Sequence, residues 1–555
     1  MNVYNKIKNY FVLVVSMLLF LSSGFYYFND DQIYLQINRG IDLFGKVYRE
    51  VSFNYVDEID PDKFVESGIE GMLSVLDPYT TYMNEKRNDD LDLIQTGKYA
   101  GVGITVGMRD NKIVITSLMD GYSAQKKGVV PGDVILEIGG NSMVGKRTES
   151  VREFVKGDPG TEVKFVISRE GEPKPLEFIL TREEIKLKNV TYFNIIQNDV
   201  GYIKLEHFSR SASEEVRQAI KELKERGNLS GLILDLRENP GGLLESAYEI
   251  AKKFVPNKSR IVSTKGRNPV SERQFVSNEE PIAGNIRMVA LVNEQSASSS
   301  EVVVGALQDL DRAVIVGNKT FGKGLVQTVV SLTNNSSLKI TTAKYYTPSG
   351  RCIQKIDYMY KNNEQIFAIK PDSLKEHFKT LNGRDMLEAG GIYPDSVVPN
   401  DSLSSYVNEL IRRAYIFKFA VQYVNANKKK ENFVLPLPTI MKEFKNYLKE
   451  QNFEYKNEIG KRLEDISKLA SANNYSSDFM NQLKAIEKSV KLESGKEFDR
   501  NEKAISQVLE TEIMGIWKGE TERIANGLKY DSQLKVAVDI VHDKKLYNKL
   551  LNIKN

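Results

Sequence analysis

The spacing of apolar residues changes several times along the chain, and each change predicts a different kind of structure. Residues 10–28 are uncharged and mainly apolar, and Lys6 and Lys8 precede them. A membrane-spanning helix needs about 20 such residues. The bulky Phe25 and Tyr26 stand where a signal-peptide cleavage site would need small side chains. We therefore expect residues 1–30 to form an uncleaved membrane anchor, with the rest of the chain exported; a removed signal peptide is the alternative.

The two regions that follow differ in period. Residues 31–85 have the spacing of amphipathic helices, as in Ile41, Phe44 and Val47. Residues 86–184 instead contain short β-rich runs separated by glycine, proline, aspartate and asparagine, with one helical stretch at 149–156. This second pattern predicts a small antiparallel barrel.

Strands and helices alternate over residues 185–400. Apolar runs at 202–205, 232–236, 288–292 and 314–316 predict strands, and stretches at 213–226, 243–254 and 299–310 predict helices. Such alternation is typical of a largely parallel sheet covered by helices, with right-handed crossovers. Residues 401–555 are patterned as helices and rich in lysine, glutamate and asparagine, which predicts a solvated helical extension that serves packing. The predicted fold class is a multidomain α/β protein.

Composition narrows the classes of function. The chain has 555 residues, enough for several domains, and its 41% hydrophobic and 27% charged content is that of a globular protein. A net charge of +3 gives no reason to propose nucleic acid or an anionic membrane surface as the main partner. The single cysteine, Cys352, excludes an internal disulfide framework and any multi-cysteine metal site. We expect neither a metal ion nor an organic cofactor.

The candidate chemistry lies in two stretches, at residues 295–301 and 320–324. The first is a serine-rich turn between a predicted strand and a predicted helix, and the second places Lys323 between two glycines. Because the chain has only three histidines, a Ser-His-Asp arrangement has little to draw on. A hydrolase that pairs a serine nucleophile with a lysine base is therefore the first hypothesis.

Ser298 has a structural as well as a chemical interpretation. With Glu301 it has the Ser-x-x-Glu spacing of a capping box, and serines are common at helix starts for that reason alone. Its position after a buried parallel strand is, however, where open α/β sheets bind their ligands. There the N–H of Ser299 would face a developing oxyanion, and Gly241-Gly242, after another predicted strand, could supply a second donor.

Lys323 needs a lowered pKa to act as a base. Burial can lower the pKa of a lysine by several units. The flanking glycines permit close packing, and Phe321, Leu325 and Val326 are apolar neighbours that could keep the amine dry. Gln327 could hold the amine through its amide oxygen. A surface lysine in a turn is the alternative.

These motifs resemble the carboxyl-terminal processing peptidase family of serine proteases. Residues 296–301 read Ser-Ala-Ser-Ser-Ser-Glu, residues 320–324 read Thr-Phe-Gly-Lys-Gly, and Gln327 follows. Further stretches at 76–82, 343–351 and 391–395 agree, so the resemblance covers roughly residues 32–400. It implies that Ser298 is the nucleophile, Lys323 the base and Gln327 the residue that orients the lysine. The sequence departs from the family at Ser299, where alanine is usual.

A second resemblance concerns the β-rich insert, which looks like a PDZ domain. Residues 99–104 are similar to the loop that binds a peptide carboxylate, and residues 128–135 to the segment that usually follows. The resemblance implies that peptide termini bind at Gly101, Val102, Gly103 and Ile104 and add a strand to a sheet edge. A tight turn before a strand is the alternative interpretation of these glycines.

The resemblances imply domains at 31–85 (helical), 86–184 (PDZ), 185–400 (protease core, ClpP/crotonase-like) and 401–555 (helical extension). They imply an endopeptidase of the bacterial cell envelope, anchored in the inner membrane and facing the periplasm, or free in the periplasm if the first segment is removed. They also imply a dimer or larger assembly, built through the helical ends. A non-catalytic PDZ adaptor is the rival function, and His207 in place of Lys323 is the rival base.

Overall fold

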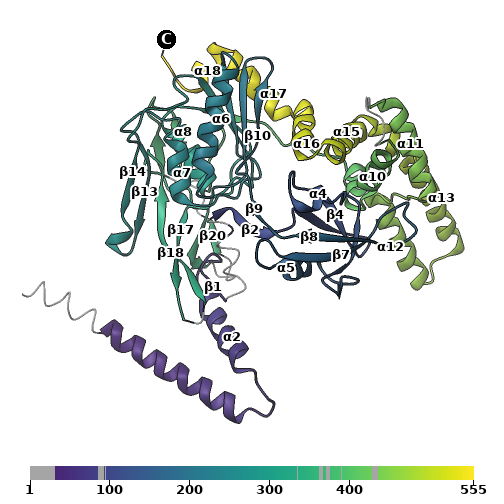
Figure 1. Ribbon diagram of the computed structural model, residues 1–555, viewed down its shortest axis with the longest axis horizontal. Helices are drawn as coiled ribbons and strands as arrows, with labels where there is room; N and C mark the ends of the chain where they lie inside the picture. Colours follow the sequence, from purple (N-terminus) through teal and green to yellow (C-terminus); the bar gives the residue numbers. More distant parts are fainter. Residues whose placement is uncertain are drawn as a thin grey trace, which may run out of the picture. The chain divides into compact units, whose positions relative to one another are not determined.

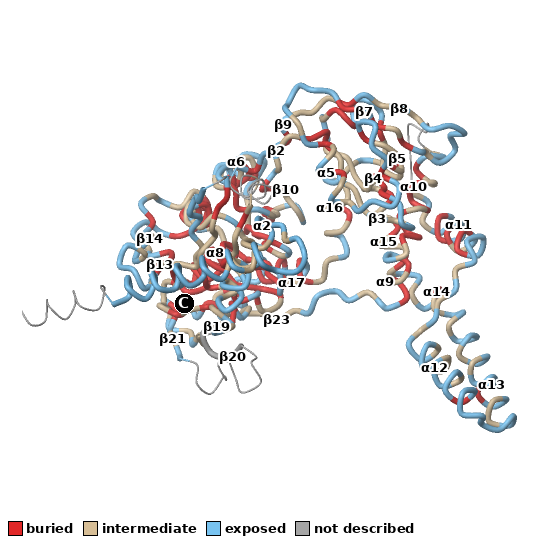
Figure 2. The backbone as a smooth tube through the Cα atoms, turned by 90° about the horizontal axis from the view of Figure 1, so that it is seen from below, coloured by how far each residue is buried: buried red, intermediate tan, exposed pale blue. Residues whose placement is uncertain are grey.

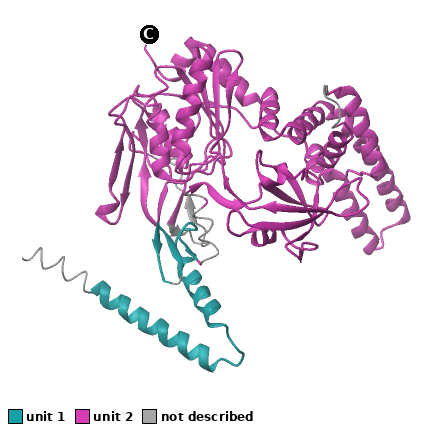
Figure 3. Ribbon diagram, in the orientation of Figure 1, with its two compact units in different colours: residues 1–83, 329–340 teal, residues 84–328, 341–555 magenta. Residues whose placement is uncertain are grey.

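The computed structural model describes residues 32–84, 93, 96–333, 335–361, 367–369, 376–388, 390–427 and 435–554. The chain divides into two compact units, which Figure 3 colours separately. Unit 1 comprises residues 1–83 and 329–340, and unit 2 comprises residues 84–328 and 341–555. The predicted membrane anchor lies outside the described residues.

The described residues of unit 1 form two helices and part of a sheet. A first helix covers residues 32–54, and α2 (Pro61–Leu73) follows it, capped by the Asp60 carboxylate. The helices contact each other through the stacked rings of Tyr48 and Phe64, whose centroids are 5.8 Å apart. β1 (Thr81–Met83) pairs antiparallel with residues 337–339 of β18 (Ser337–Tyr346). Within the described part of the chain, no helix is both long and apolar enough to cross a membrane.

The β-rich insert forms a sheet with the predicted antiparallel pairing, but its strand order is linear and does not close into the predicted barrel. Its strand order is β3-β4-β5-β7-β8, so β3 is an edge strand, and β6 pairs with β5. Strands β2 and β9 pair antiparallel with each other; in the chain, β2 precedes the strands of this sheet and β9 follows them. The bounds are β2 Lys98–Gly101, β3 Ile104–Arg109, β4 Lys112–Leu118, α4 Ser123–Lys126, β5 Val134–Ile138, β6 Asn141–Ser142, α5 Thr148–Val155, β7 Glu162–Ser168, β8 Leu176–Thr181 and β9 Glu183–Lys186.

The largest sheet of unit 2 has the order β10-β11-β12-β15-β16-β23, and all of its pairs are parallel except β10–β11. The predicted parallel sheet is thus confirmed. Its elements are β10 Val190–Ile196, β11 Val200–Leu205, α6 Ala212–Arg226, β12 Gly231–Asp235, α7 Leu244–Ala251, β15 Arg287–Val292, α8 Ser299–Asp309, β16 Val314–Gly317 and β23 Ser396–Val397.

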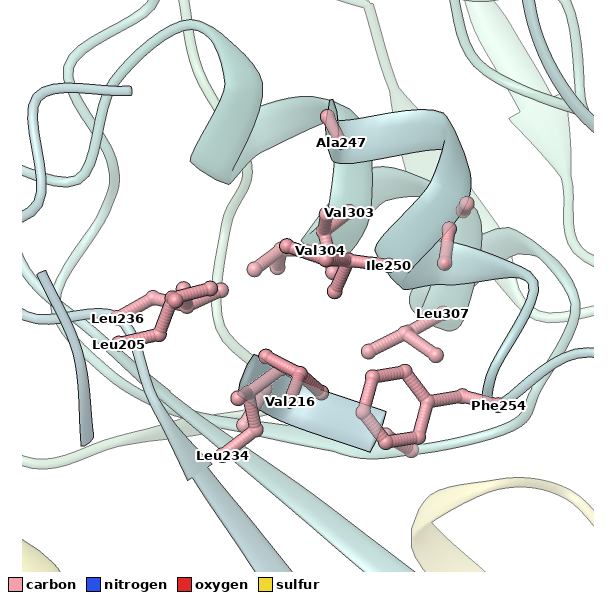
Figure 4. Packing of buried hydrophobic residues seen from close by; sticks show 14 of the residues in the cluster. Leu205, Val216, Leu234, Leu236, Ala247, Ile250, Phe254, Val303, Val304 and Leu307 are labelled. Carbon is pink, nitrogen blue, oxygen red and sulfur yellow. The ribbon is translucent and has the colours of Figure 1, made fainter. Parts of the chain in front are cut away.

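Helices cover both faces of this sheet. Alternate side chains of a strand point to opposite faces, and Leu234 and Leu236 pack with residues of α6, α7 and α8 such as Val216, Ile250 and Val303, as Figure 4 shows. On the other face Ile233, Val289 and Leu291 pack against α17 (Ser532–His542) and α18 (Lys544–Leu550). Figure 1 shows α6, α7 and α8 side by side. Burial on both faces explains the continuous apolar runs in these strands.

The sequence did not predict a second, antiparallel sheet. β18 pairs with β17 and, through residues 343–346, with β13, which pairs with β14. Its strands carry many polar and half-exposed residues, so they lack the apolar runs used to find the first sheet. The remaining elements are β13 Arg260–Gly266, η1 Pro269–Ser271, β14 Arg273–Val276, β17 Leu325–Ser331, β19 Ile356–Lys361, β20 Phe367–Ile369, β21 His377–Lys379 and β22 Asp385–Leu387.

Residues 401–555 are helical, as predicted, but they do more than form a solvated bundle. A core of their own joins α9, α10, α11, α14 and α15, while α12 and α13 are largely exposed (Figure 2). The last two helices, α17 and α18, cover one face of the largest sheet. The bounds are α9 Ser405–Arg412, α10 Tyr415–Asn427, α11 Leu437–Glu450, α12 Glu458–Ala472, α13 Ser477–Ser494, α14 Glu497–Arg500, α15 Glu502–Lys518, α16 Glu520–Gly527 and η3 Leu528–Tyr530.

A buried ion-pair network attaches α17 to the sheet. The Arg237 guanidinium donates to Asp235 at 2.9 Å, and to Asp531 and Gln533 at 3.0 Å each. Burial alone would raise the pKa of Asp235, but the charge and hydrogen bonds of Arg237 lower it to about 2. Tyr202 also donates to Asp235, at 2.6 Å. The carboxylate is therefore ionised and fully paired at the end of β12.

Candidate active site

Ser298 begins α8 in a strained conformation. Its φ is 53° and its ψ is −113°, a region that L-residues rarely adopt. The Glu301 carboxylate accepts a hydrogen bond from the Ser298 N–H at 2.9 Å, as the capping-box spacing predicts. Strain that a structure holds in place at one residue is a common mark of a functional position.

The neighbouring serines hold the turn to the loop that follows β12. Ser296 Oγ donates to the Leu236 carbonyl at 2.8 Å, and Ser300 Oγ donates to the Asn239 carbonyl at 2.9 Å. Ser299 Oγ donates to the Gly242 carbonyl at 2.9 Å. These hydroxyls are structural links, which supports Ser298 as the nucleophile among the serines of the turn.

Glu301 joins the serine turn to the lysine loop. Its Oε2 accepts hydrogen bonds from the N–H groups of Ser298 and Lys323, both at 2.9 Å. Its Oε1 accepts from the Gly322 N–H at 2.7 Å and from Thr320 Oγ1 at 2.6 Å. The side chain is fully buried. A single carboxylate thus places the backbone of Ser298 beside that of Lys323.

The ionisation of Glu301 is linked to stability. Burial raises its pKa from 4.5 to about 7, against the opposing effect of the hydrogen bonds from Thr320, Lys323, Gly322 and Ser298. At about 1.4 kcal/mol per pKa unit, the protonated carboxyl stabilises the folded state by roughly 3 kcal/mol relative to the ionised carboxylate. Because the pKa is higher in the folded state, this stabilisation is fully present below pH 4.5 and is lost as the pH rises through about 7. Above that pH the folded protein holds an ionised Glu301, and its free energy of unfolding is lower for that reason.

Lys323 lies on the loop that precedes β17, and Gln327 lies on that strand. Lys323 is half-buried, and Gly322 has a φ of 90°. Of the apolar neighbours predicted to keep the amine dry, Leu325 is buried and Phe321 is 47% exposed. Gln327 lies on β17, and its Nε2 donates to Thr341 Oγ1 at 3.3 Å.

Tyr345 is a site residue that sequence analysis did not single out. This buried residue of β18 brings its hydroxyl within 3.0 Å of the Ser298 carbonyl oxygen, and the hydroxyl also contacts the Lys323 carbonyl oxygen. Its backbone N–H donates to the Gly324 carbonyl at 3.0 Å. The segment that carries it, 343–351, was recognised as a motif, but a motif alone does not say which side chain reaches the serine.

The glycines predicted to help hold an oxyanion lie against the serine turn. A Cβ on Gly241 would lie 2.7 Å from the Ala297 carbonyl oxygen and 2.9 Å from the Ser299 nitrogen. The Gly241 N–H donates to Asn239 Oδ1 at 2.9 Å, so it already has an acceptor. The Gly242 carbonyl, in turn, is held by Ser299 Oγ. Among the candidate donors, the N–H of Ser299 is the one at the helix start, where N–H groups face outward.

The other predicted residues lie apart from this turn in the chain. Gly101 ends β2 and Ile104 begins the edge strand β3, with Val102 and Gly103 between them. Gly103 has a φ of 81°, and a Cβ there would lie 2.4 Å from Cβ of Tyr122, so only glycine fits. His207 is exposed, two residues beyond the end of β11.

The geometry defines a class of protein before any comparison. A strained serine at a helix start, tied through one carboxylate to a glycine-flanked lysine, provides a candidate nucleophile and a candidate base for a hydrolase that acts through an acyl-enzyme. The chain is therefore best described first as a serine hydrolase.

Comparisons with known proteins narrow this class to a family. Family models match residues 199–372 (peptidase family S41), 91–168 (PDZ domain), 29–87 (activating protease CtpB N-terminal domain) and 406–541 ("Probable PDZ-protease, C-terminal helical domain"). The carboxy-terminal-processing protease of Bartonella bacilliformis is 38% identical over 331 residues, which cover 59% of this chain and 75% of that protein. The carboxy-terminal processing protease CtpB of Bacillus subtilis is 35% identical over 364 residues, which cover 63% of this chain and 74% of that protein.

Solved structures include one similar protein of the same kind. The photosystem II D1 C-terminal processing protease is 27% identical, with 67% of this chain and 96% of that chain covered and a TM-score of 0.36. The sequence relatives decide the family. The chain belongs to the carboxy-terminal processing serine proteases of peptidase family S41, as its motifs indicated.

Gly241 provides a test of the close approach at the serine turn. We expect Gly241→Ala to lower kcat/KM for a protein substrate by about 100-fold or more, because the new Cβ would displace the turn and the Ser299 N–H, the candidate oxyanion donor. Gly284→Ala is the control: Gly284 also has a positive φ, of 63°, but a Cβ there meets nothing within 4 Å. Activity is measured by gel-based cleavage at equal amounts of folded protein. Equal activity of the two variants would contradict the close packing of Gly241 on the turn.

Proposed function

We propose that the chain is an exported endopeptidase that captures proteins by their C-termini and cleaves them through a Ser298–Lys323 acyl-enzyme mechanism. One observation carries the proposal. The N–H groups of Ser298 and Lys323 share a single oxygen of buried Glu301, at 2.9 Å each. Glu301 and Lys323 are 22 residues apart in the chain, and their contact holds the serine turn beside the lysine loop. A PDZ adaptor without catalytic activity would have no need of this arrangement.

In the proposed mechanism Lys323 acts in its neutral form. Its amine takes the proton of Ser298 Oγ as the oxygen attacks the peptide carbonyl. The Ser299 N–H, with Gly241 or Gly242, stabilises the oxyanion of the tetrahedral intermediate. The intermediate collapses to an acyl-enzyme when the lysine returns the proton to the leaving amine, and water then releases the acyl group. Gln327 orients the lysine.

The nucleophile and the base are tested by single substitutions. We expect Ser298→Ala and Lys323→Ala each to lower cleavage of a partly unfolded protein by about 100-fold or more, without a change in folding. Lys319→Ala is the control, because Lys319 is a nearby lysine that contacts Tyr393 instead. Cleavage is followed by gel electrophoresis, and folding by circular dichroism. Full activity of either test variant would refute the mechanism and leave the adaptor function; loss of activity only in His207→Ala would favour His207 as base.

The PDZ domain supports capture of a C-terminus. PDZ domains bind an extended peptide beside an exposed strand, and β3 is an edge strand that begins at Ile104, directly after Gly101, Val102 and Gly103. We propose that these residues hold the terminal carboxylate and that the added strand feeds the substrate to the protease. We also propose that the protease core has a ClpP/crotonase-like architecture.

A free carboxylate is the chemical requirement of this capture. We expect a peptide with an apolar C-terminal residue to bind Ser298→Ala at least about tenfold more tightly than the same peptide amidated, because a charge-assisted hydrogen bond contributes roughly 1.5–3 kcal/mol. Fluorescence anisotropy with a labelled peptide measures both affinities. Equal affinities would show that the domain does not recognise the terminus.

We further propose that residues 1–30 anchor the protein in the bacterial inner membrane with the protease in the periplasm, and that copies associate through unit 1. No residue of α2 is buried, and the first helix exposes large apolar side chains such as Ile37 (50%) and Ile41 (66%). Apolar surface of this kind usually marks an interface. We propose that a second copy of this chain covers this surface, since both helices of unit 1 are exposed and carry apolar side chains that could pack against the same helices of another copy.

Assembly is tested on the full chain in detergent. We expect Ile37→Glu combined with Ile41→Glu to sediment as a monomer at concentrations where the parent chain is a dimer or larger. Arg39→Glu, which changes charge at an exposed position between them, should leave the sedimentation coefficient unchanged. A parent chain that is monomeric in sedimentation velocity would refute the proposal.

A further inference from the structure

The catalytic serine and lysine are held at both ends of their backbone by the same two side chains. Their N–H groups donate to one carboxylate oxygen, Glu301 Oε2, at 2.9 Å each. Their carbonyl oxygens are both in contact with one phenol, that of Tyr345. Glu301 lies in the first turn of α8, whose N-cap is Ser298, and reaches across to the lysine loop, whereas Tyr345 lies on β18 and belongs to neither segment.

We propose that Glu301 and Tyr345 are positioning residues that together set the separation of the Ser298 nucleophile and the Lys323 base. The inference rests on the proposed Ser298–Lys323 mechanism and deepens it. Fixing only one end of each residue would leave its side chain free to swing about that end. Fixing the N–H and the C=O of both residues defines the direction in which each Cα–Cβ bond points, and so where Oγ and the amine can meet.

Burial makes this arrangement stiff. Glu301 is fully buried and Tyr345 is 2% exposed, so water does not compete for their hydrogen bonds. Tyr345 is anchored by its own N–H on the Gly324 carbonyl, and Glu301 by Thr320 Oγ1 and the Gly322 N–H. Thr320 Oγ1 also accepts the Ile392 N–H at 2.7 Å. Beyond Ser298 and Lys323 themselves, the pair is therefore fixed to other groups of the lysine loop, and Thr320 links that loop to Ile392.

The two positioning residues have opposite hydrogen-bonding roles: Glu301 accepts from N–H groups, and the Tyr345 hydroxyl donates to carbonyl oxygens. An ionised Glu301 only accepts, and all four of its partners are donors. A glutamine there has one acceptor oxygen and one NH2 group, so whichever way it is turned its NH2 faces at least one backbone N–H. Tyr345 supplies one O–H to two carbonyl oxygens, and phenylalanine removes that O–H while it preserves the ring.

Two conservative variants test the proposal by steady-state kinetics. We expect Tyr345→Phe and Glu301→Gln each to lower kcat by about 10- to 100-fold while KM changes less than about twofold, because a misaligned nucleophile and base slow the chemical step without weakening substrate binding. The melting temperature of Tyr345→Phe should match that of its control. A residue that only stabilised the fold would lower the melting temperature and leave kcat per folded molecule unchanged, which would overturn the proposal.

Matched controls delete the same chemistry elsewhere. Tyr248→Phe removes a phenol that donates to the Val276 carbonyl at 2.9 Å. Glu215→Gln alters a carboxylate that accepts the N–H groups of Asn189 and Val190 at 2.7 and 3.0 Å. Both controls should keep kcat within about twofold of the parent chain, since neither residue lies at the serine turn. If they lose as much activity as the test variants, the effect is general and the proposal fails.

A double variant asks whether the two residues act on the same distance. If they do, Glu301→Gln with Tyr345→Phe should cost less than the product of the two single losses in kcat. Fully multiplicative losses would overturn a joint role. If Glu301→Gln does not fold, Tyr345→Phe alone decides the matter through kcat, KM and melting temperature.

The same assay separates this inference from the proposed function. Ser298→Ala run beside the other variants must be inactive for the mechanism to stand. An active Ser298→Ala refutes the mechanism, and the positioning role with it. An inactive Ser298→Ala together with fully active Tyr345→Phe and Glu301→Gln refutes only the positioning role.

Discussion

A buried carboxylate is the constraint on which the active-site region depends. Glu301 has no exposed surface, yet it must satisfy donors from its own helix and from the loop at 320–323. A buried charge is costly unless it is fully hydrogen-bonded, so the loop cannot move away without leaving that charge uncompensated. The need to satisfy this carboxylate therefore fixes the distance between the serine turn and the lysine loop, which are separate in the sequence.

The sheet explains why this carboxylate is where it is. Parallel strands covered on both faces end at a common edge, and the loops after β12 and β15 meet there. Serine hydroxyls of the turn then tie those loops together through the carbonyl groups of Leu236, Asn239 and Gly242. Apolar packing on both faces forms the edge of the sheet, and these hydrogen bonds fix the positions of the loops at that edge. The strained backbone of Ser298 is tolerated because both of its neighbouring segments are held.

Sequence reasoning succeeded where the signal was local or periodic. The apolar runs of β12 and β15 predicted buried strands, and the Ser-x-x-Glu spacing predicted the bond from Glu301 to the Ser298 N–H. It missed what depends on distant contacts. The bonds of Glu301 to the lysine loop, the role of Tyr345 on a half-exposed strand, and the packing of α17 on the sheet each join segments whose proximity no short pattern encodes. The exposure of Phe321 was not predictable either, because hydrophobicity does not fix the direction of a side chain.

The attachment of α17 has a consequence for how the protein is made. Arg237 precedes the loop that carries Gly241, while its partners Asp531 and Gln533 lie 294 and 296 positions further along the chain. Ribosomes deliver residues in order, so the loop is synthesised long before the helix that secures it. Until that helix emerges, Asp235 lacks part of its counter-charge network and one face of the sheet is bare. We expect proteolytic competence to arrive only after α17 has been synthesised and has packed on the sheet, which spares the nascent chain and its neighbours from an incomplete protease.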